Sequence, residues 1–67
     1  MENKNYITIG DTVIVSRGLA SLSHPHTQKA HRGTVVGFYR NFFNVQYEEG
    51  WQQSIMYRDI NKIRLAV

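Results

Sequence analysis

Residues 43–57 read FNVQYEEGWQQSIMY and carry the clearest structural pattern in the chain. Phe43, Val45 and Tyr47 alternate with polar residues, which is the two-residue period of a half-buried β-strand. Glu49-Gly50 then interrupts the run as a turn would. The next run again alternates, and one of its faces carries Trp51, Gln53, Ile55 and Tyr57. Together the two runs predict a β-hairpin with one buried face.

Further short runs of β-branched or aromatic residues flank this hairpin. Residues 12–16 and 33–39 are interpreted as two earlier strands, and residues 63–65 as a last one. Arg40-Asn41 is expected to form a tight turn, because Asn tolerates the left-handed backbone conformation. A short 3-10 turn is expected just before the last strand, where Asp59 precedes Ile60-Asn61-Lys62.

Five short strands with a long polar loop from Gly18 to Arg32 predict an all-β fold. We expect a small five-stranded antiparallel barrel over residues 10–67, preceded by a partly frayed segment, residues 1–9. Closing a sheet on itself lets a short chain bury one face of every strand. Gly33 and Gly37 suit a strand that bends sharply or allows another backbone to approach closely.

The composition sets limits on the class of protein. The chain has 67 residues, a formal net charge of +3 and no cysteine. One domain is the most that this length allows, and a disulfide framework, a cysteine zinc site and a thiol nucleophile are excluded. A core this small leaves a thin stability margin, so a partner subunit or a homo-oligomer is plausible. No apolar stretch approaches the length of a membrane span, so we expect no membrane association. Residues 1–5 lack an apolar signal core, so we expect a cytoplasmic location, in a cell or in a virus-infected host.

The pattern Gly10-Asp11-x-Val13-x-Val15, followed by Gly33-Thr34-Val35-Val36 and Val45-x-Tyr47, resembles the SH3-like barrel group. That group includes the KOW domains of ribosomal and transcription proteins. It also includes the small ferredoxin-docking subunits of photosystem I and of the cyanobacterial NDH complex, to which the segments 47–51 and 57–60 are similar. The loop from Arg17 to His31 is longer than a typical KOW linker. The resemblance implies the barrel fold over residues 10–65, and a binding rather than a catalytic role.

Three histidines fall in the long polar loop. His24 and His26 flank Pro25, and side chains two residues apart in an extended segment point to the same side. The pair could therefore ligate a Zn²⁺ or Ni²⁺ ion, with His31 as a third nitrogen ligand. A closed metal site needs four ligands, and the loop offers no cysteine or carboxylate. The alternative interpretation is a solvent-facing polar loop, and we expect no bound metal.

The same loop also carries positive charge. Arg17, Lys29 and Arg32 gather near one rim of the predicted barrel, and Arg40 at the next turn is expected to extend this patch. Two aromatic residues are candidates for exposure beside it, namely Phe42, which is out of phase with Phe43, and Trp51, which lies at a turn. Cations beside exposed rings suit single-stranded nucleic acid, whose phosphates bind Lys and Arg while its bases stack on aromatic side chains. They equally suit an acidic protein surface.

Enzymatic interpretations find little support. The sequence has no nucleophile-elbow pattern and no phosphate-binding glycine loop, and Glu48-Glu49 is most simply part of a turn. One enzyme has this fold, the plasmid-encoded type II dihydrofolate reductase, and Ser54-Ile55-Met56-Tyr57 is similar to its active-site run only at the tyrosine. We therefore expect no catalytic residues and no cofactor.

The sequence as a whole predicts a non-enzymatic binding module that acts through a basic loop and an aromatic rim. Nucleic acid or a nucleoprotein machine is the first expected partner, contacted by Arg17, Lys29, Arg32, Arg40, Phe42 and Trp51. The alternative is docking to an acidic protein, either as a ferredoxin-docking subunit or as a small viral or phage inhibitor of a host enzyme. No single residue distinguishes the two.

Overall fold

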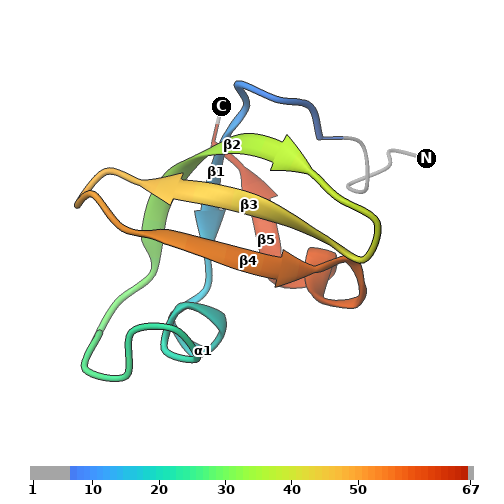
Figure 1. The fold of residues 1–67 in the computed structure, drawn as a ribbon. Helices are drawn as coiled ribbons and strands as arrows, with labels where there is room; N and C mark the ends of the chain where they lie inside the picture. The colour runs from blue at the N-terminus through green and yellow to red at the C-terminus, as the bar shows by residue number, and fades with distance from the viewer. Residues whose placement is uncertain (1–6, 67) are drawn as a thin grey trace.

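The computed structural model describes residues 7–66, which form one five-stranded antiparallel sheet in the order β4-β3-β2-β1-β5 (Figure 1). A single α-helical turn, α1 (Arg17–Ala20), follows β1, and a 3-10 helix, η1 (Tyr57–Lys62), precedes β5. The expected all-β class, the five antiparallel strands and the 3-10 turn are therefore confirmed. The strands are β1 (Thr12–Val15), β2 (His31–Phe38), β3 (Phe42–Tyr47), β4 (Gln52–Met56) and β5 (Ile63–Leu65).

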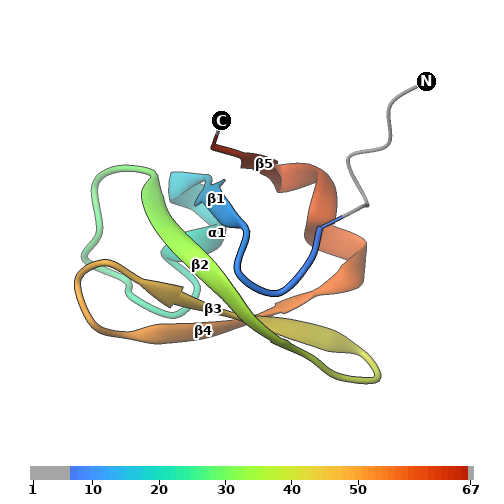
Figure 2. The ribbon, with the colours of Figure 1, turned by 90° about the horizontal axis from the view of Figure 1, so that it is seen from above.

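The sheet is bent so that its two halves face each other. β2 is the longest strand and belongs to both halves, because residues 31–34 pair with β1 while residues 33–38 pair with β3. A register shift between Val35 and Gly37 interrupts the second pairing, as a bulge does in a strand that must bend. Seen from above, β2 runs diagonally from the β1–β5 half to the β3–β4 half (Figure 2). This arrangement fits the SH3-like architecture that was expected.

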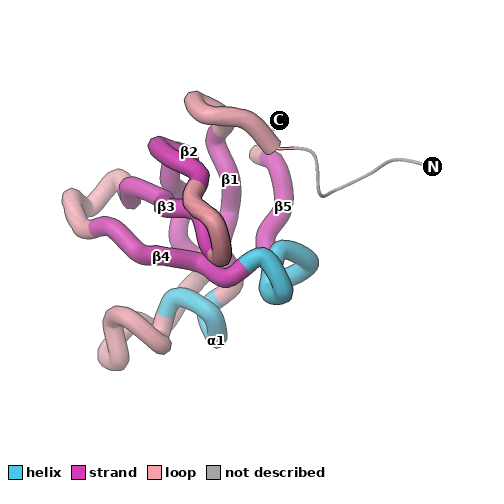
Figure 3. Tube along the Cα trace, turned by 45° about the vertical axis from the view of Figure 1, so that its right-hand side comes forward, coloured by secondary structure: helices cyan, strands magenta, loops and turns pink. Residues whose placement is uncertain are grey.

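The core lies between the two halves of the sheet. The alternation predicted for residues 43–57 is confirmed, because Phe43, Val45, Tyr47, Gln53 and Ile55 are all buried. Val13 and Val15 from β1 and Ile63 from β5 cover them from the other half. η1 contacts both β4 and β5, and Figure 3 shows it between the end of β4 and the start of β5.

The long polar loop is shorter than the sequence predicted. Ser16 caps α1 by accepting a hydrogen bond from the Leu19 N–H at 3.3 Å, and Leu19 and Ala20 are buried. At the other end, β2 begins at His31 rather than Gly33, because the inward-facing positions continue back from Val35 through Gly33 to His31. Only residues 21–30 therefore connect the two elements, and His31 belongs to the strand.

The two predicted turns are present, although one forms for a different reason. The Tyr39 N–H donates to the Phe42 carbonyl at 2.8 Å across Arg40-Asn41, yet no non-glycine residue from 7 to 66 has a positive φ. Asn41 therefore does not use the left-handed conformation on which the prediction relied. Gly50 does, with a φ of +108°, where it closes the β3–β4 turn.

The predicted frayed segment 1–9 lies mostly outside the described residues. Of its last three residues, Ile7 packs against the core and the Thr8 N–H donates to Asp11 Oδ2 at 2.8 Å. No helix in residues 7–66 has both the length and the hydrophobicity needed to cross a membrane.

Candidate functional site

The register of the sheet aligns two arginines and an isoleucine on the outer face of β5, β1 and β2. Ile14 pairs with Arg64 of β5 on one side and with Arg32 of β2 on the other. Directly opposed residues on neighbouring strands point to the same face, with Cβ atoms about 5 Å apart. Since Val13 and Val15 point into the core, this row points outward.

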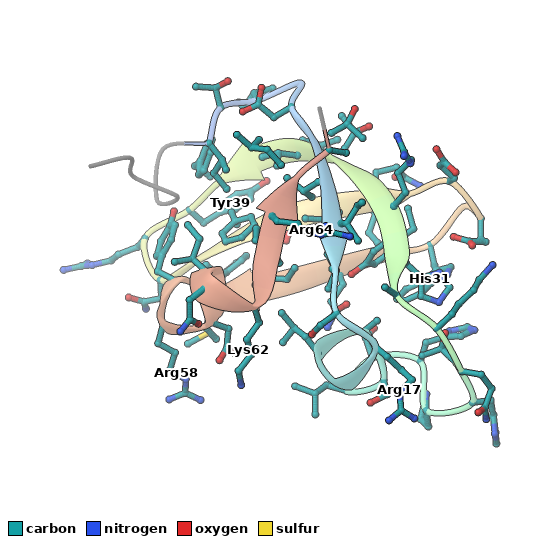
Figure 4. All side chains as sticks on the ribbon, turned by 180° about the vertical axis from the view of Figure 1, so that it is seen from behind. Arg17, His31, Tyr39, Arg58, Lys62 and Arg64 are labelled. Carbon is teal, nitrogen blue, oxygen red and sulfur yellow. The ribbon has the colours of Figure 1, made fainter. Side chains whose placement is uncertain are left out.

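A groove of about 880 Å³ runs beside this row, along β1 and β5. Carbon atoms make up most of its surface, from Ile7, Ile14, Ala30, Ile63 and Leu65. Three cationic side chains also line it, Arg17, Lys62 and Arg64. Figure 4 labels these three cations, with Arg64 over the strands and Arg17 at α1. The groove thus combines an apolar floor with positive charge.

The cations of the groove differ in how far they are already neutralised. Lys62 Nζ lies 3.4 Å from Asp59 Oδ1. Arg32, beside the groove, lies 4.0 Å from Glu48 Oε2, but both side chains are more than half exposed, so water screens this contact. Among residues 7–66, no ion pair involves Arg17 or Arg64. These two guanidinium groups are therefore the strongest candidates for binding an external anion.

The predicted basic patch is only partly brought together. Arg17 lines the groove and Arg32 lies in the outer row with Ile14 and Arg64. Arg40, in contrast, lies in the turn beyond the far end of β2 and is not among the residues that line the groove. Lys29 lies in the loop between α1 and β2 and does not line the groove. Arg40 therefore does not extend the patch.

The two aromatic side chains that were expected to contact a partner, Trp51 and Phe42, both pack against neighbouring rings. Trp51 packs against the core, with its ring centroid 4.1 Å from that of Tyr47 and stacked on His24 at 4.5 Å. Phe42 stacks on Tyr39 at 5.0 Å, beside the β2–β3 turn. Trp51 is thus half-buried between the core and the loop, and Phe42 is not among the residues that line the groove.

The three histidines do not form a common site. His31 is buried, with Nδ1 3.1 Å from Glu49 Oε2 and Nε2 hydrogen-bonded to Thr27 Oγ1, so both ring nitrogens have protein partners. The Glu49 pKa lies below its ordinary value because its own backbone N–H and then His31 hydrogen-bond the carboxylate. His24 stacks on Trp51 instead. Within residues 7–66, no three such side chains are grouped closely enough to hold a metal ion.

Sequence reasoning missed Lys62 and Arg64 as members of the site. Residues 63–65 were correctly expected to form a strand, and alternation with the apolar Ile63 indicates that Arg64 points outward. Nothing local indicates that β5 pairs with β1 rather than with β4, and only that pairing brings Arg64 beside Ile14 and Arg17. The sequence therefore indicates which way Arg64 points, but not which residues lie beside it.

No family model matches this chain, and neither a curated protein nor a solved structure gives a match. The chemistry of the groove is therefore judged from its own residues. Its described lining holds no carboxylate, cysteine or histidine that could move a proton or attack a substrate, and the hydroxyl of Ser16 caps α1. What the arrangement can do is bind a ligand that is both anionic and partly apolar.

Proposed function

We propose that this protein is a non-enzymatic docking module that binds an acidic, partly apolar segment of another protein in the groove beside β5. One observation carries the proposal. Arg17, Lys62 and Arg64 surround a groove whose floor is mainly carbon and whose described lining contains no carboxylate. Opposite charges guide association and select the partner, while the apolar floor contributes binding free energy as it is removed from water.

The residues that line the groove favour protein over nucleic acid as its occupant. Single-stranded nucleic acid is bound by cations together with exposed aromatic rings on which bases stack. No aromatic residue is among those that line this groove in residues 7–66. The isoleucines and the leucine there offer surface to aliphatic side chains instead.

Binding of nucleic acid at the other end of the molecule is the second candidate function. Tyr39 is 52% exposed, stacks on Phe42 and directly precedes Arg40 in the β2–β3 turn. A cation beside an accessible ring is the minimal element of a base-stacking site. The two candidates use different residues, so one experiment can separate them.

The experiment is a titration of the isotope-labelled protein, followed by NMR, with two defined probes. The first is a peptide of about ten residues that alternates glutamate with valine, and the second is a thymidine oligonucleotide of similar length. We expect the peptide to shift the resonances of Ile14, Arg17 and Arg64. The double variant Arg17→Glu/Arg64→Glu should bind the peptide about tenfold more weakly, since each partly exposed charge pair contributes up to about 1 kcal/mol.

The matched control is Arg40→Glu/Arg58→Glu, which makes the same change in net charge away from the groove. It should bind the peptide almost as tightly as the original protein. Equal weakening in both double variants would mean that net charge alone matters, and the groove would then have no role. Binding of the oligonucleotide but not of the peptide, lost on Arg40→Glu, would replace docking by the second candidate.

A further inference from the structure

β5 is an edge strand, and its backbone has hydrogen-bonding groups that β1 does not use. The strand order ends at β5, which pairs with β1 on one side. The Ala66 N–H donates to the Thr12 carbonyl at 2.9 Å, and the Ser16 N–H donates to the Lys62 carbonyl at 3.3 Å. Backbone groups of residues 62, 64 and 66 therefore face β1, and those of the alternate residues 63 and 65 face the free edge.

Within residues 7–66, three of these outward groups lack a hydrogen-bond partner. The Ile63 N–H donates to the Ile60 carbonyl and so belongs to the end of η1. The Ile63 carbonyl and the N–H and carbonyl of Leu65 have no hydrogen-bond partner among residues 7–66. Ile63 is buried, whereas Leu65 is 42% exposed, so the N–H and carbonyl of Leu65 are the edge groups onto which an extended segment can add as a further strand.

The side chains at this edge specify what such a segment must carry. Arg64 points to the outer face, in the row with Ile14 and Arg32. Ile63 and Leu65 alternate with it, and Leu65, which is 42% exposed, lines the groove together with Ile7. A strand placed beside β5 would present alternate side chains to these two environments. Acidic residues on one face and aliphatic residues on the other match both.

The other edge of the sheet lacks this selectivity. β4 is also an edge strand, and its exposed positions Gln52, Ser54 and Met56 line a smaller groove of about 530 Å³. The charged residues of that groove are one of each sign, Arg58 and Asp59. It has no excess charge with which to attract an acidic chain, whereas the β5 groove has three cations.

We propose that the docked partner segment is extended, alternates acidic with aliphatic residues, and adds to the sheet as a sixth strand beside β5. This inference rests on the proposed docking function and names its occupant and its mode of binding. The backbone of Leu65 supplies hydrogen bonds, Arg64 and Arg17 bind the acidic side chains, and Ile7 and Leu65 contact the aliphatic ones.

Amide hydrogen exchange in the unmodified protein, with and without the alternating glutamate–valine peptide, tests the mode of binding. At saturation we expect exchange of the Leu65 N–H to slow by about tenfold or more, because it gains a hydrogen bond. The Arg64 N–H is the internal control, since it already faces β1 and should change much less. An unchanged Leu65 rate in the bound protein would overturn strand addition.

A pair of variants and a rearranged peptide give a second test. Leu65→Pro removes the outward N–H without breaking a bond to β1, and Leu65→Ala keeps that N–H while shortening the side chain. We expect Leu65→Pro to weaken peptide binding by about tenfold, and Leu65→Ala by less. A peptide of the same composition with its glutamates and valines in two blocks should bind about tenfold more weakly than the alternating one. Equal affinity for the two peptides would contradict the inference.

The failure of this inference is distinguishable from the failure of the proposed function. Suppose that the peptide binds and that Arg17→Glu/Arg64→Glu weakens its binding, while the exchange rate of the Leu65 N–H does not change and Leu65→Pro has no effect on affinity. Docking then stands and strand addition is wrong. If neither peptide binds, both proposals fall.

Discussion

At Gly33 the lack of a side chain decides how closely two strands approach. Gly33 of β2 lies between Val13 of β1 and Tyr47 of β3. A Cβ atom there would lie 2.5 Å from Val45 Cγ1 and 2.9 Å from the Gln46 carbonyl oxygen. The sequence predicted either a sharp bend or a close backbone approach at this glycine. The structure shows the close approach, because the Gln46 carbonyl and the Val45 side chain occupy the space that a side chain would need.

Gly33→Ala is therefore expected to destabilise the protein by about 1–3 kcal/mol, because backbone and β-branched neighbours cannot move aside cheaply. Chemical denaturation followed by Trp51 fluorescence measures the loss. Gly18→Ala is the matched control, since a Cβ there meets nothing within 4 Å and lies in a helical turn. It should be neutral or slightly stabilising, by up to about 1 kcal/mol. Equal losses in the two variants would refute the packing argument.

Tyr47 is a buried polar residue whose hydroxyl is part of a hydrogen-bonded chain. Its O–H donates to Gln53 Oε1 at 2.7 Å, and Gln53 Nε2 donates to the Leu19 carbonyl at 2.9 Å. The chain links β3, β4 and α1. Burial, with a smaller contribution from the charge of Glu49, raises the pKa of Tyr47 above its ordinary value of 10.0.

This shift predicts how stability depends on pH in the alkaline range. The folded protein keeps the Tyr47 proton while the unfolded chain releases it from about pH 10, so the stabilisation is complete below pH 10 and is lost as the pH rises further. Tyr47→Phe should be less stable at neutral pH by about 1–3 kcal/mol, because Gln53 loses its donor. Its free energy of unfolding should then fall less steeply above pH 10.

Urea unfolding at a series of pH values from neutral to alkaline measures both effects. Tyr39→Phe, at an exposed ring, is the control and should follow the original protein. The explanation is wrong if Tyr47→Phe loses stability with pH as steeply as this control.

At the scale of elements, the segment 21–30 is held to the sheet by side chains rather than by backbone pairing. His24 stacks on Trp51, with an interplanar angle of 16°, and Thr27 hydrogen-bonds the buried His31. His31 in turn contacts Glu49 in the β3–β4 turn. These contacts join the loop to the β3–β4 turn. A sequence pattern cannot reveal them, because the residues are distant along the chain.

Trp51→Ala is expected to free this segment and to destabilise the fold by about 2–4 kcal/mol, through loss of a large ring from the packed cluster. Hydrogen exchange of amides in residues 21–30 should become faster by more than exchange in β3. Trp51→Phe keeps an aromatic ring, so its stability and its loop exchange rates should lie between those of Trp51→Ala and of the original protein. If the loop amides exchange at the original rate in Trp51→Ala, the stack does not restrain the loop.

At the scale of the whole molecule, the fold gathers part of its positive charge around one groove. Arg17, Lys62 and Arg64 lie around the groove beside β5, whereas Arg40 lies beyond the far end of β2. The net charge of +3 alone does not distinguish a uniform surface from such an arrangement. The bent sheet makes the difference, because it places β5 next to β1.

The sequence by itself determined which residues are inside, since a period of two along a strand assigns every second side chain to the core. For that reason the burial of Phe43, Val45, Tyr47 and Ile55 could be predicted. The short helix before the last strand could be predicted from Asp59, which precedes Ile60-Asn61-Lys62. Only the tertiary structure decided which strands are neighbours. Register is a property of pairs of strands, and the alignment of Arg64 with Ile14 and Arg32, like the packing of Trp51 under His24, depends on contacts between residues far apart in the chain.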